Sequence, residues 1–271
     1  MRGAVSEDDG GKKERRQAFL VRYLEQHQYI TLDEIASLCS VTTQTARRDI
    51  MALEREGKLR RTHGGAVISQ PFETGVYHQR RVSNPEAKAA IARKVAELLP
   101  DGCSVFIDTG TTCEAVARAL VARKNLRVVT YSLRVATTLS ESTDFTIAVP
   151  GGFIRNMDAA VFGENVQGFI RAFKFDYVVI SVSGIDDDGD IGDDDYAEVA
   201  AVRAAMQQAA CVILAIDSSK FQHRALVRLG SVCEVDIVVS ETAPTEKLQA
   251  VLSRGKATYH VADALDGRMT S

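Results

Sequence analysis

The run from Thr42 to Gly65 constrains this 271-residue chain more than any other part of its sequence. Ala46, Ile50 and Leu53 recur at i, i+4 and i+7, which is the spacing of a helix with one buried face. Thr42 is a good N-cap for that helix. Two short strand-like stretches joined by a Gly-Gly turn follow directly. A helix that leads into a β-hairpin in this way is typical of a winged helix-turn-helix.

A second helix is expected just before this one. Thr31 and Glu34 have the spacing of a capping box, in which two side chains satisfy free N–H groups at the start of a helix. The apolar face is formed by Leu32, Ile35, Ala36 and Leu38, and the helix is expected to end near Cys39. A short turn then leads to Thr42, so the pattern predicts two capped helices in close succession.

The outer face of the second helix and the hairpin carry the residues expected to contact DNA. Six basic and three acidic residues lie between positions 41 and 68, so this part is positive although the whole chain has a net charge of −3. Amide and guanidinium groups can read a major groove, and a basic hairpin can approach phosphates. The candidate DNA-binding residues are Thr42, Thr43, Gln44, Thr45, Arg47, Arg48, Arg55, Lys58, Arg60, Arg61 and His63. The alternative interpretation is that these are solvated side chains on an ordinary helical hairpin.

Composition limits the class of protein. With 45% hydrophobic and 25% charged residues the chain can bury a sizeable core, and its length favours two domains. No apolar run approaches the roughly 18 residues that span a bilayer, and the polar start lacks the apolar centre of a signal peptide. We therefore expect a cytoplasmic protein that does not contact a membrane. The five scattered cysteines favour neither a disulfide framework nor a zinc site, so we expect reduced thiols.

After a segment with little periodicity, apolar strand-like runs alternate with helical patterns. The expected strands are 103–107, 126–130, 145–149, 177–182, 211–216 and 236–239. Alternation of this kind predicts an α/β domain with a mostly parallel sheet. The expected division is a disordered tail over 1–13, the winged helix-turn-helix over 14–69, a linker over 70–85, and the α/β domain over 86–271.

Ligands of open α/β sheets bind beyond the carboxyl ends of the strands, and the sequence Asp108-Thr-Gly-Thr-Thr112 lies at such an end. Gly110 lets a ligand approach the backbone, and the following helix start offers free N–H groups to a phosphate. The same turn could simply cap a helix. Lys220 follows a later strand and offers a cation to an anionic ligand, although a lysine at such a position is commonly exposed to solvent.

These motifs carry a resemblance to a known family. The run Ala46-Arg-Arg-Asp-Ile50, with Leu53-Glu54, Gly57 and Arg61-x-His63-Gly-Gly-Ala66, resembles the DNA-binding signature of DeoR-family bacterial transcription regulators. Asp108-x-Gly-Thr-Thr112, Ser183-Gly-Ile185 and Asp217-x-Ser-Lys-Phe221 are similar to the sensor domain of that family. The resemblance implies a domain related to sugar-phosphate isomerases that binds a phosphorylated metabolite as its effector. It also implies a homo-oligomer, a dimer or a tetramer, which binds double-stranded operator DNA.

The resemblance further implies the effector contacts. Asp108, Gly110, Thr111 and Thr112 would hold the phosphate, and other strand ends would complete the pocket. The candidate effector-binding residues are Asp108, Gly110, Thr111, Thr112, Ser132, Gly151, Gly152, Arg155, Ser183, Gly184, Glu198 and Lys220. Glycerol 3-phosphate is the leading candidate, because several runs resemble most closely the branch of the family that represses glycerol-3-phosphate regulons. Tyr131 departs from the family pattern, which commonly has Asn at this position.

Two other functions are compatible with parts of this sequence. A sugar-phosphate isomerase or hydrolase with an accessory DNA-binding domain would need a carboxylate that moves a proton, and Asp108 and Glu198 are the candidates. A constitutive repressor would use its larger domain only to oligomerise. An EF-hand loop starting at Asp186 would need Gly and Glu where Ile191 and Ala197 stand, so we expect no metal ion, and the sequence predicts no cofactor and no catalytic residue.

Overall fold

The computed structural model describes residues 7–27, 29–56, 58–62, 65–68, 77 and 80–263. It forms two compact units, residues 1–78 and 79–271. In the described ranges no helix has the length and apolar character that a membrane span requires.

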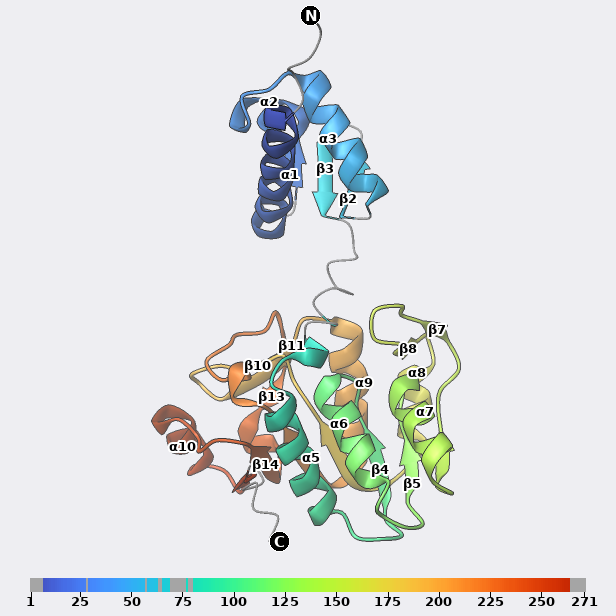
Figure 1. Cartoon of the computed structure of the whole chain (residues 1–271). Coiled ribbons are helices and arrows are strands. Elements are labelled where there is room, and N and C mark those ends of the chain that lie inside the picture. The colour runs from blue at the N-terminus through green and yellow to red at the C-terminus, as the bar shows by residue number, and fades with distance from the viewer. Residues whose placement is uncertain are drawn as a thin grey trace, which may run out of the picture. The chain divides into compact units, whose positions relative to one another are not determined.

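The first unit contains three helices and a small antiparallel sheet in its described part. Its elements are α1 (Glu7–His27), β1 (Tyr29–Thr31), α2 (Leu32–Leu38), α3 (Thr43–Arg55), β2 (Leu59–Thr62) and β3 (Gly65–Ile68) (Figure 1). The strand order is β1-β3-β2, and Thr62 pairs with Gly65 where the hairpin turns. The expected helix-turn-helix and wing are therefore confirmed, with β1 as an additional strand.

The predicted helix caps of this unit are present. The Glu34 N–H donates to Thr31 Oγ1 at 3.1 Å, and the Thr31 N–H donates to Glu34 Oε2 at 2.7 Å, which completes the capping box. The Thr45 N–H donates to Thr42 Oγ1 at 3.2 Å. The expected apolar stripe of α3 is buried in the core of the unit. That core contains Leu20, Leu24, Ile30, Ile35, Ala46, Ile50, Leu53, Leu59 and Ala66.

Two expected irregular segments differ from the structure. Helix α1 begins at Glu7, so residues 7–13 are helical rather than a disordered tail. Arg80–Val82 are also helical, and α5 begins at Pro85, so the end of the expected linker is ordered. Proline is pre-organised for the first position of a helix.

The second unit is built on a seven-stranded sheet. Its helices are α5 (Pro85–Leu98), α6 (Thr111–Leu120), α7 (Leu133–Ser142), α8 (Val166–Arg171), α9 (Tyr196–Met206) and α10 (Glu246–Leu252), with short 3-10 helices η1 (Ser218–Lys220) and η2 (Val232–Glu234). The sheet strands are β4 (Ser104–Ile107), β5 (Arg127–Val129), β6 (Thr146–Ala148), β9 (Phe175–Ile180), β12 (Ala209–Ala215), β14 (Ile237–Ser240) and β15 (Thr258–Val261). Their order is β15-β14-β12-β9-β4-β5-β6, and all neighbours are parallel.

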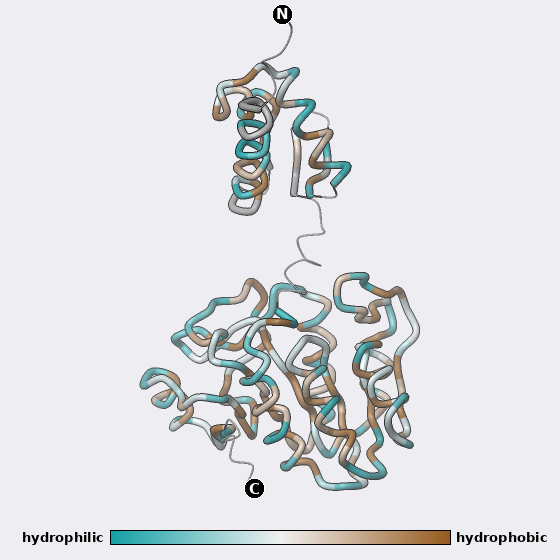
Figure 2. The backbone as a smooth tube through the Cα atoms, in the orientation of Figure 1, coloured by the Kyte–Doolittle hydropathy of each residue, from teal (hydrophilic) through white to brown (hydrophobic). Residues whose placement is uncertain are grey.

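Side chains alternate between the two faces of this sheet, as strand geometry requires. On β4, Val105 and Ile107 join a core formed with α5, α6 and α7, whereas Phe106 joins the core beneath α8, α9 and α10. Hydrophobic residues accordingly follow the central strands in Figure 2. The six predicted strands are confirmed, and the sheet brings their carboxyl ends to one edge.

Smaller elements extend that edge. Strands β10 (Gly184–Ile185), β11 (Asp190–Asp193) and β13 (Val227–Ser231) form an antiparallel sheet, and β7 (Phe153–Ile154) pairs with β8 (Val161–Phe162). The acidic turn 186–189, whose sequence does not fit an EF-hand loop, joins β10 to β11. All five cysteines are free thiols, of which Cys103 and Cys113 are buried.

Candidate DNA-binding surface and effector site

Helix α3 presents a polar face to solvent. Thr43, Gln44, Arg47 and Arg48 are exposed, and so is Arg55 near the end of the helix. Thr42 and Thr45 are partly occupied in the N-terminal cap, where their hydroxyls also lie 3.0 Å apart. The exposed amide and guanidinium groups are the kind that reads a major groove.

The opposite face of α3 is fixed to α1 by a polar contact that the sequence pattern did not predict. Asp49 is 2% exposed, and its carboxylate accepts hydrogen bonds from Arg16 Nε at 2.5 Å and Gln17 Nε2 at 3.1 Å. A buried carboxylate needs such partners. Asp49 thus sets how α3 lies on α1.

The hairpin is less positive than its sequence suggests. Lys58 pairs with Glu56 at 2.7 Å, and Arg61 Nε pairs with Glu54 Oε2 at 2.5 Å. The Arg61 N–H also donates to Glu54 and is the main cause of the lowered pKa of that carboxyl. His63 and the side chain of Arg60 lie outside the described residues.

At the carboxyl edge of the large sheet, Asp108 ties three strands together. Its carboxylate accepts hydrogen bonds from the Thr109 N–H at 2.8 Å, the Tyr131 hydroxyl at 2.5 Å and the Ser181 N–H at 3.4 Å. These donors follow β4, β5 and β9. Asp108 is 3% exposed, and this burial raises its pKa to about 7. Its geometry suits a residue that positions the strand ends.

The turn after Asp108 has the form expected of an anion site. Gly110 has φ +98, a conformation that favours glycine, and it is the N-cap of α6 without a side-chain cap. Thr111 and Thr112 begin the helix. The turn therefore directs main-chain N–H groups at the helix start toward this edge of the sheet.

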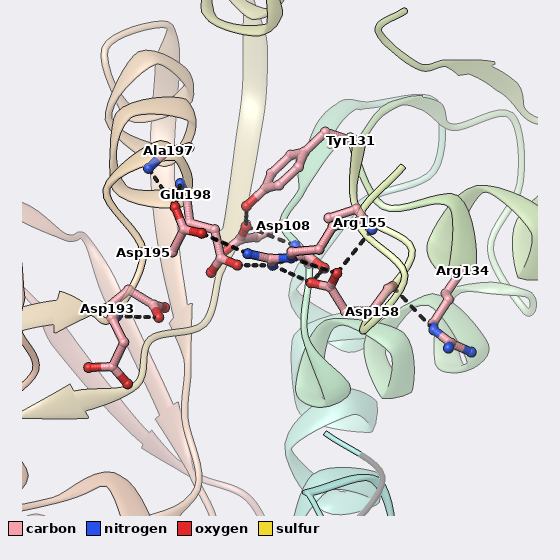
Figure 3. Close-up of polar contacts among 12 residues, drawn as sticks. Asp108, Tyr131, Arg134, Arg155, Asp158, Asp193, Asp195, Ala197 and Glu198 are labelled. Carbon is pink, nitrogen blue, oxygen red and sulfur yellow. Dashed lines mark hydrogen bonds and ion pairs between the residues drawn. The ribbon is translucent and has the colours of Figure 1, made fainter. Parts of the chain in front are cut away.

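Arg155 lies at the centre of a group of carboxylates (Figure 3). Its guanidinium contacts Asp158 with Nε–Oδ1 at 2.9 Å, Asp195 with Nη1–Oδ2 at 2.9 Å, and Glu198 through Nη2. The Phe162 ring packs 4.7 Å from the guanidinium carbon. Burial lowers the pKa of Arg155, but the hydrogen bond with Asp158 and the charge of Glu198 outweigh it and raise that pKa. Arg155 is fully engaged by protein groups and joins the β7–β8 segment to the start of α9.

Burial raises the pKa of Glu198, and the nearby charge of Asp193 acts in the same direction, while Arg155 opposes both. Asp193 itself accepts a hydrogen bond from the Ser183 hydroxyl at 2.8 Å. The site thus concentrates negative charge on the side of α9 and β11.

Basic side chains lie near these carboxylates. Burial lowers the pKa of Lys220 in η1, as does the charge of Arg80, whereas Asp217 and Asp193 raise it. Lys88 in α5 is 6% exposed; burial is the main cause of its lowered pKa, and Lys220 is close enough to contribute. A cavity of about 370 Å³ between α5 and α6 is lined by Lys88 and Thr111, together with Arg81, Arg93, Arg118 and Glu114. Lys88 therefore lines the same cavity as Thr111, and the charge of Lys220 also acts on it.

Several expected effector contacts have structural roles that compete with ligand binding. Ser132 is 1% exposed and caps α7 through a hydrogen bond from the Val135 N–H at 3.4 Å. A Cβ at Gly152 would lie 2.3 Å from the Phe162 carbonyl oxygen, and one at Gly184 would lie 2.2 Å from the His223 carbonyl oxygen. The Ser183 hydroxyl donates a hydrogen bond to Asp193. Gly151 has open space around it.

Residues that the sequence interpretation missed complete the site. Asp195 could have been found, because Asp followed three residues later by Glu198 is a helix-start signal, and Asp195 does cap α9. Asp158 lies in a loop without periodicity, and nothing in the sequence indicated that Arg155 and Thr109 would both contact it. Tyr131 was noted only as a departure from a family pattern.

The sequence matches two family descriptions: a DeoR-like helix-turn-helix domain over residues 16–72 and a DeoR C terminal sensor domain over residues 83–242. The chain belongs to the DeoR family. In this DeoR-family chain the winged unit is the helix-turn-helix domain and the α/β unit is the sensor domain.

Curated relatives span nearly the whole chain. The glycerol-3-phosphate regulon repressor of Escherichia coli (strain K12) is 39% identical over 242 residues, covering 89% of this chain and 96% of the relative. The HTH-type transcriptional repressor CsqR of the same organism is 38% identical over 233 residues, covering 86% and 89%. Among solved structures, ribose 5 phosphate isomerase A from Neisseria gonorrhoeae aligns over 51% of this chain and 53% of its own, with 16% identity and a TM-score of 0.36.

Proposed function

We propose that the chain is a transcriptional repressor that binds double-stranded operator DNA through α3 and the β2–β3 hairpin and releases it when a phosphorylated sugar or polyol binds the sensor domain. Glycerol 3-phosphate is the first compound to test, because relatives named for that regulon are 39% identical to this chain. A homo-oligomer, dimer or tetramer, would present paired recognition helices to two half-sites.

The position of Lys88 is the observation that supports a phosphate site in the sensor domain. Lys88 lines one cavity with Thr111 at the start of α6, where no side chain caps the helix, and the charge of Lys220 lowers its pKa. Main-chain N–H groups, a hydroxyl and ammonium groups are together a good environment for a phosphate. Lys220 and the turn Gly110–Thr112 are therefore the core of the proposed site, and Asp108 and Arg155 hold its frame.

An enzymatic alternative rests on Asp108 and Glu198, since carboxyl groups with raised pKa values suit general acid–base catalysis. Asp108, however, is occupied by three donors and Glu198 by Arg155. We expect no turnover of sugar phosphates, and conversion of any of them would favour the enzyme. A constitutive repressor would instead show no phosphate-dependent thermal shift.

The test uses the full chain and an operator duplex selected from a random pool. Glycerol 3-phosphate should raise the melting temperature and release the duplex, whereas glycerol should do neither, because the charge-assisted hydrogen bonds to phosphate would be absent. Lys220→Ala should weaken effector binding about 10-fold or more, the equivalent of one such bond. Lys124→Ala, an exposed lysine that precedes β5, is the matched control and should respond normally. Normal binding by Lys220→Ala would disprove the phosphate site.

A further inference from the structure

The segment Arg80–Asn84 connects the sensor domain to the DNA-binding domain along the chain. It directly precedes α5, and its residues 80–82 are helical. Asn84 adopts the left-handed conformation with φ +50, and its side chain makes no hydrogen bond to the start of α5. Two other contacts attach this segment to the sensor domain.

Lys88 provides one attachment. Its buried ammonium donates to the carbonyl oxygen of Ser83 at 2.7 Å and also to that of Arg80. Within the described part of the chain no carboxylate lies within 4.0 Å of this ammonium. The carbonyl groups of the segment therefore compensate the buried charge of the Lys88 ammonium. These hydrogen bonds attach the segment firmly, because leaving a buried charge without partners would cost free energy.

Asn84 provides the second attachment. Its Nδ2 donates to Asp217 Oδ1 at 3.2 Å, across 133 positions of sequence. Asp217 is 2% exposed and caps η1 by accepting from the Ser219 N–H at 3.2 Å. Lys220 is the last residue of η1. The connecting segment is therefore bound to the loop that carries Lys220, the residue proposed to bind the phosphate.

Charge links the two attachments. Arg80, Lys88 and Lys220 are close enough that the positive charge of each neighbour lowers the pKa of Lys88, and that of Arg80 lowers the pKa of Lys220. Asp217 opposes this repulsion in both cases, and Asp193 and Asp194 also face Lys220. An anion placed beside Lys220 would reduce the repulsion between these cations and so favour the arrangement in which the segment is attached.

We propose that the Asn84–Asp217 hydrogen bond and the Lys88 contacts couple the effector site to the connecting segment, so that a phosphate bound beside Lys220 holds residues 80–84 more firmly on the sensor domain. This inference rests on the proposed function for the identity of the ligand. The attachment itself does not depend on the ligand. Binding of the effector then restricts the segment through which the sensor domain is joined to the helix-turn-helix domain.

Trypsin provides a direct measure, because Arg80 and Arg81 lie within the segment. The full chain is digested briefly with and without glycerol 3-phosphate, and cleavage after these residues is followed by mass spectrometry. Asn84→Gly removes the amide and keeps a residue that tolerates positive φ. The matched control is Asn125→Gly, since Asn125 also has a left-handed backbone (φ +58) but precedes β5 at the other edge of the strands.

Asn84→Gly should cleave about fivefold faster than the wild type without ligand, as expected for the local loss of one hydrogen bond. Asn125→Gly should cleave at the wild-type rate. The effector should slow cleavage of the wild type by at least about threefold. In Asn84→Gly this protection should be lost, and the effector should no longer release operator DNA. The affinity of Asn84→Gly for the effector should stay within about threefold of the wild-type value.

Wild-type cleavage or protection in Asn84→Gly would overturn the inference. A different failure would be that the wild type binds no phosphorylated compound while Asn84→Gly is still cleaved faster by trypsin. That result would refute the proposed function and the coupling, and would support only the attachment of the segment. The two failures are therefore distinguishable.

Discussion

The hydrogen bond between Tyr131 and Asp108 yields a pH-dependent prediction for Tyr131→Phe. The Tyr131 side chain is fully buried, and its ring packs on Phe106 and Phe162 with centroids 6.1 and 5.8 Å away, so phenylalanine should fit without a cavity. The change removes one hydroxyl that donates to a buried carboxyl. Its effect on stability should depend on whether that carboxyl is charged.

The sign follows from the pKa of Asp108. Burial raises this pKa from 3.8 to about 7 in the folded protein, so folding takes up a proton between these values and the free energy of unfolding falls as the pH rises through them. The Tyr131 hydroxyl lowers the pKa because it favours the charged form. Its removal should raise the pKa further and extend the loss of stability above pH 7.

At pH 8 the lost bond is to a carboxylate and should cost about 2 kcal/mol, whereas at pH 5.5 the carboxyl is mostly neutral and the cost should be about 1 kcal/mol or less. For a domain of this size these values correspond to a lowering of the melting temperature by about 4–8 °C at pH 8 and about 2–4 °C or less at pH 5.5.

Differential scanning calorimetry of the full chain measures both values in the sensor-domain transition. Tyr259→Phe is the control, because its hydroxyl donates to the neutral carbonyl of Thr242 at 2.8 Å and its pKa of about 12 lies far above both conditions. That variant should show the same small change at both pH values. An equal loss at pH 5.5 and pH 8 in Tyr131→Phe would refute the reasoning.

Three further predictions follow from contacts of the two domains. Arg48→Ala should weaken operator binding by about 1–3 kcal/mol in a fluorescence anisotropy titration if it reads a base, and equal binding by Arg48→Ala and the exposed control Arg22→Ala would contradict this. Arg61→Gln should reduce the slope of log K for operator binding against log salt by less than the roughly 0.9 expected of a full phosphate contact. The reason is that the Arg61 guanidinium is shared with the carboxylate of Glu54 in α3. An unchanged slope would exclude a phosphate contact by Arg61. Arg155→Met should destabilise the sensor domain by about 3–5 kcal/mol in urea unfolding, since it leaves Asp158, 3% exposed, without its cation, and a loss below 1 kcal/mol would show that this ion pair is not needed.

Local patterns predicted the helix-turn-helix and the core of the sheet well. The caps at Thr31 and Thr42 and the apolar stripe of α3 depend only on residues within a few positions of each other. Strands buried on both faces read as continuous apolar runs. Strand β15 was missed because it is an edge strand with no fully buried residue, and its sequence Thr-Tyr-His-Val mixes polar and apolar side chains.

The polar site was predicted only in part. The turn at Gly110 has a local glycine signal, and its place at the strand end follows from α/β topology. The partners of Arg155 lie 3, 40 and 43 positions away, and which carboxylates meet one guanidinium depends on how loops pack. For the same reason the sequence did not reveal the three donors that join Asp108 to the ends of three strands, and its expected contact with the effector stays a prediction.

The order of strands in the large sheet also determines when each domain can be completed during synthesis. The first unit ends its last described strand at Ile68, but central strand β4 must wait for β9, and β12 must wait for β14, which ends at Ser240. At ribosomal rates the interval between these points is roughly 10 to 30 seconds. A nascent chain can therefore carry a complete helix-turn-helix domain before its sensor domain is complete, so during this interval the first domain lacks the part proposed to bind the effector.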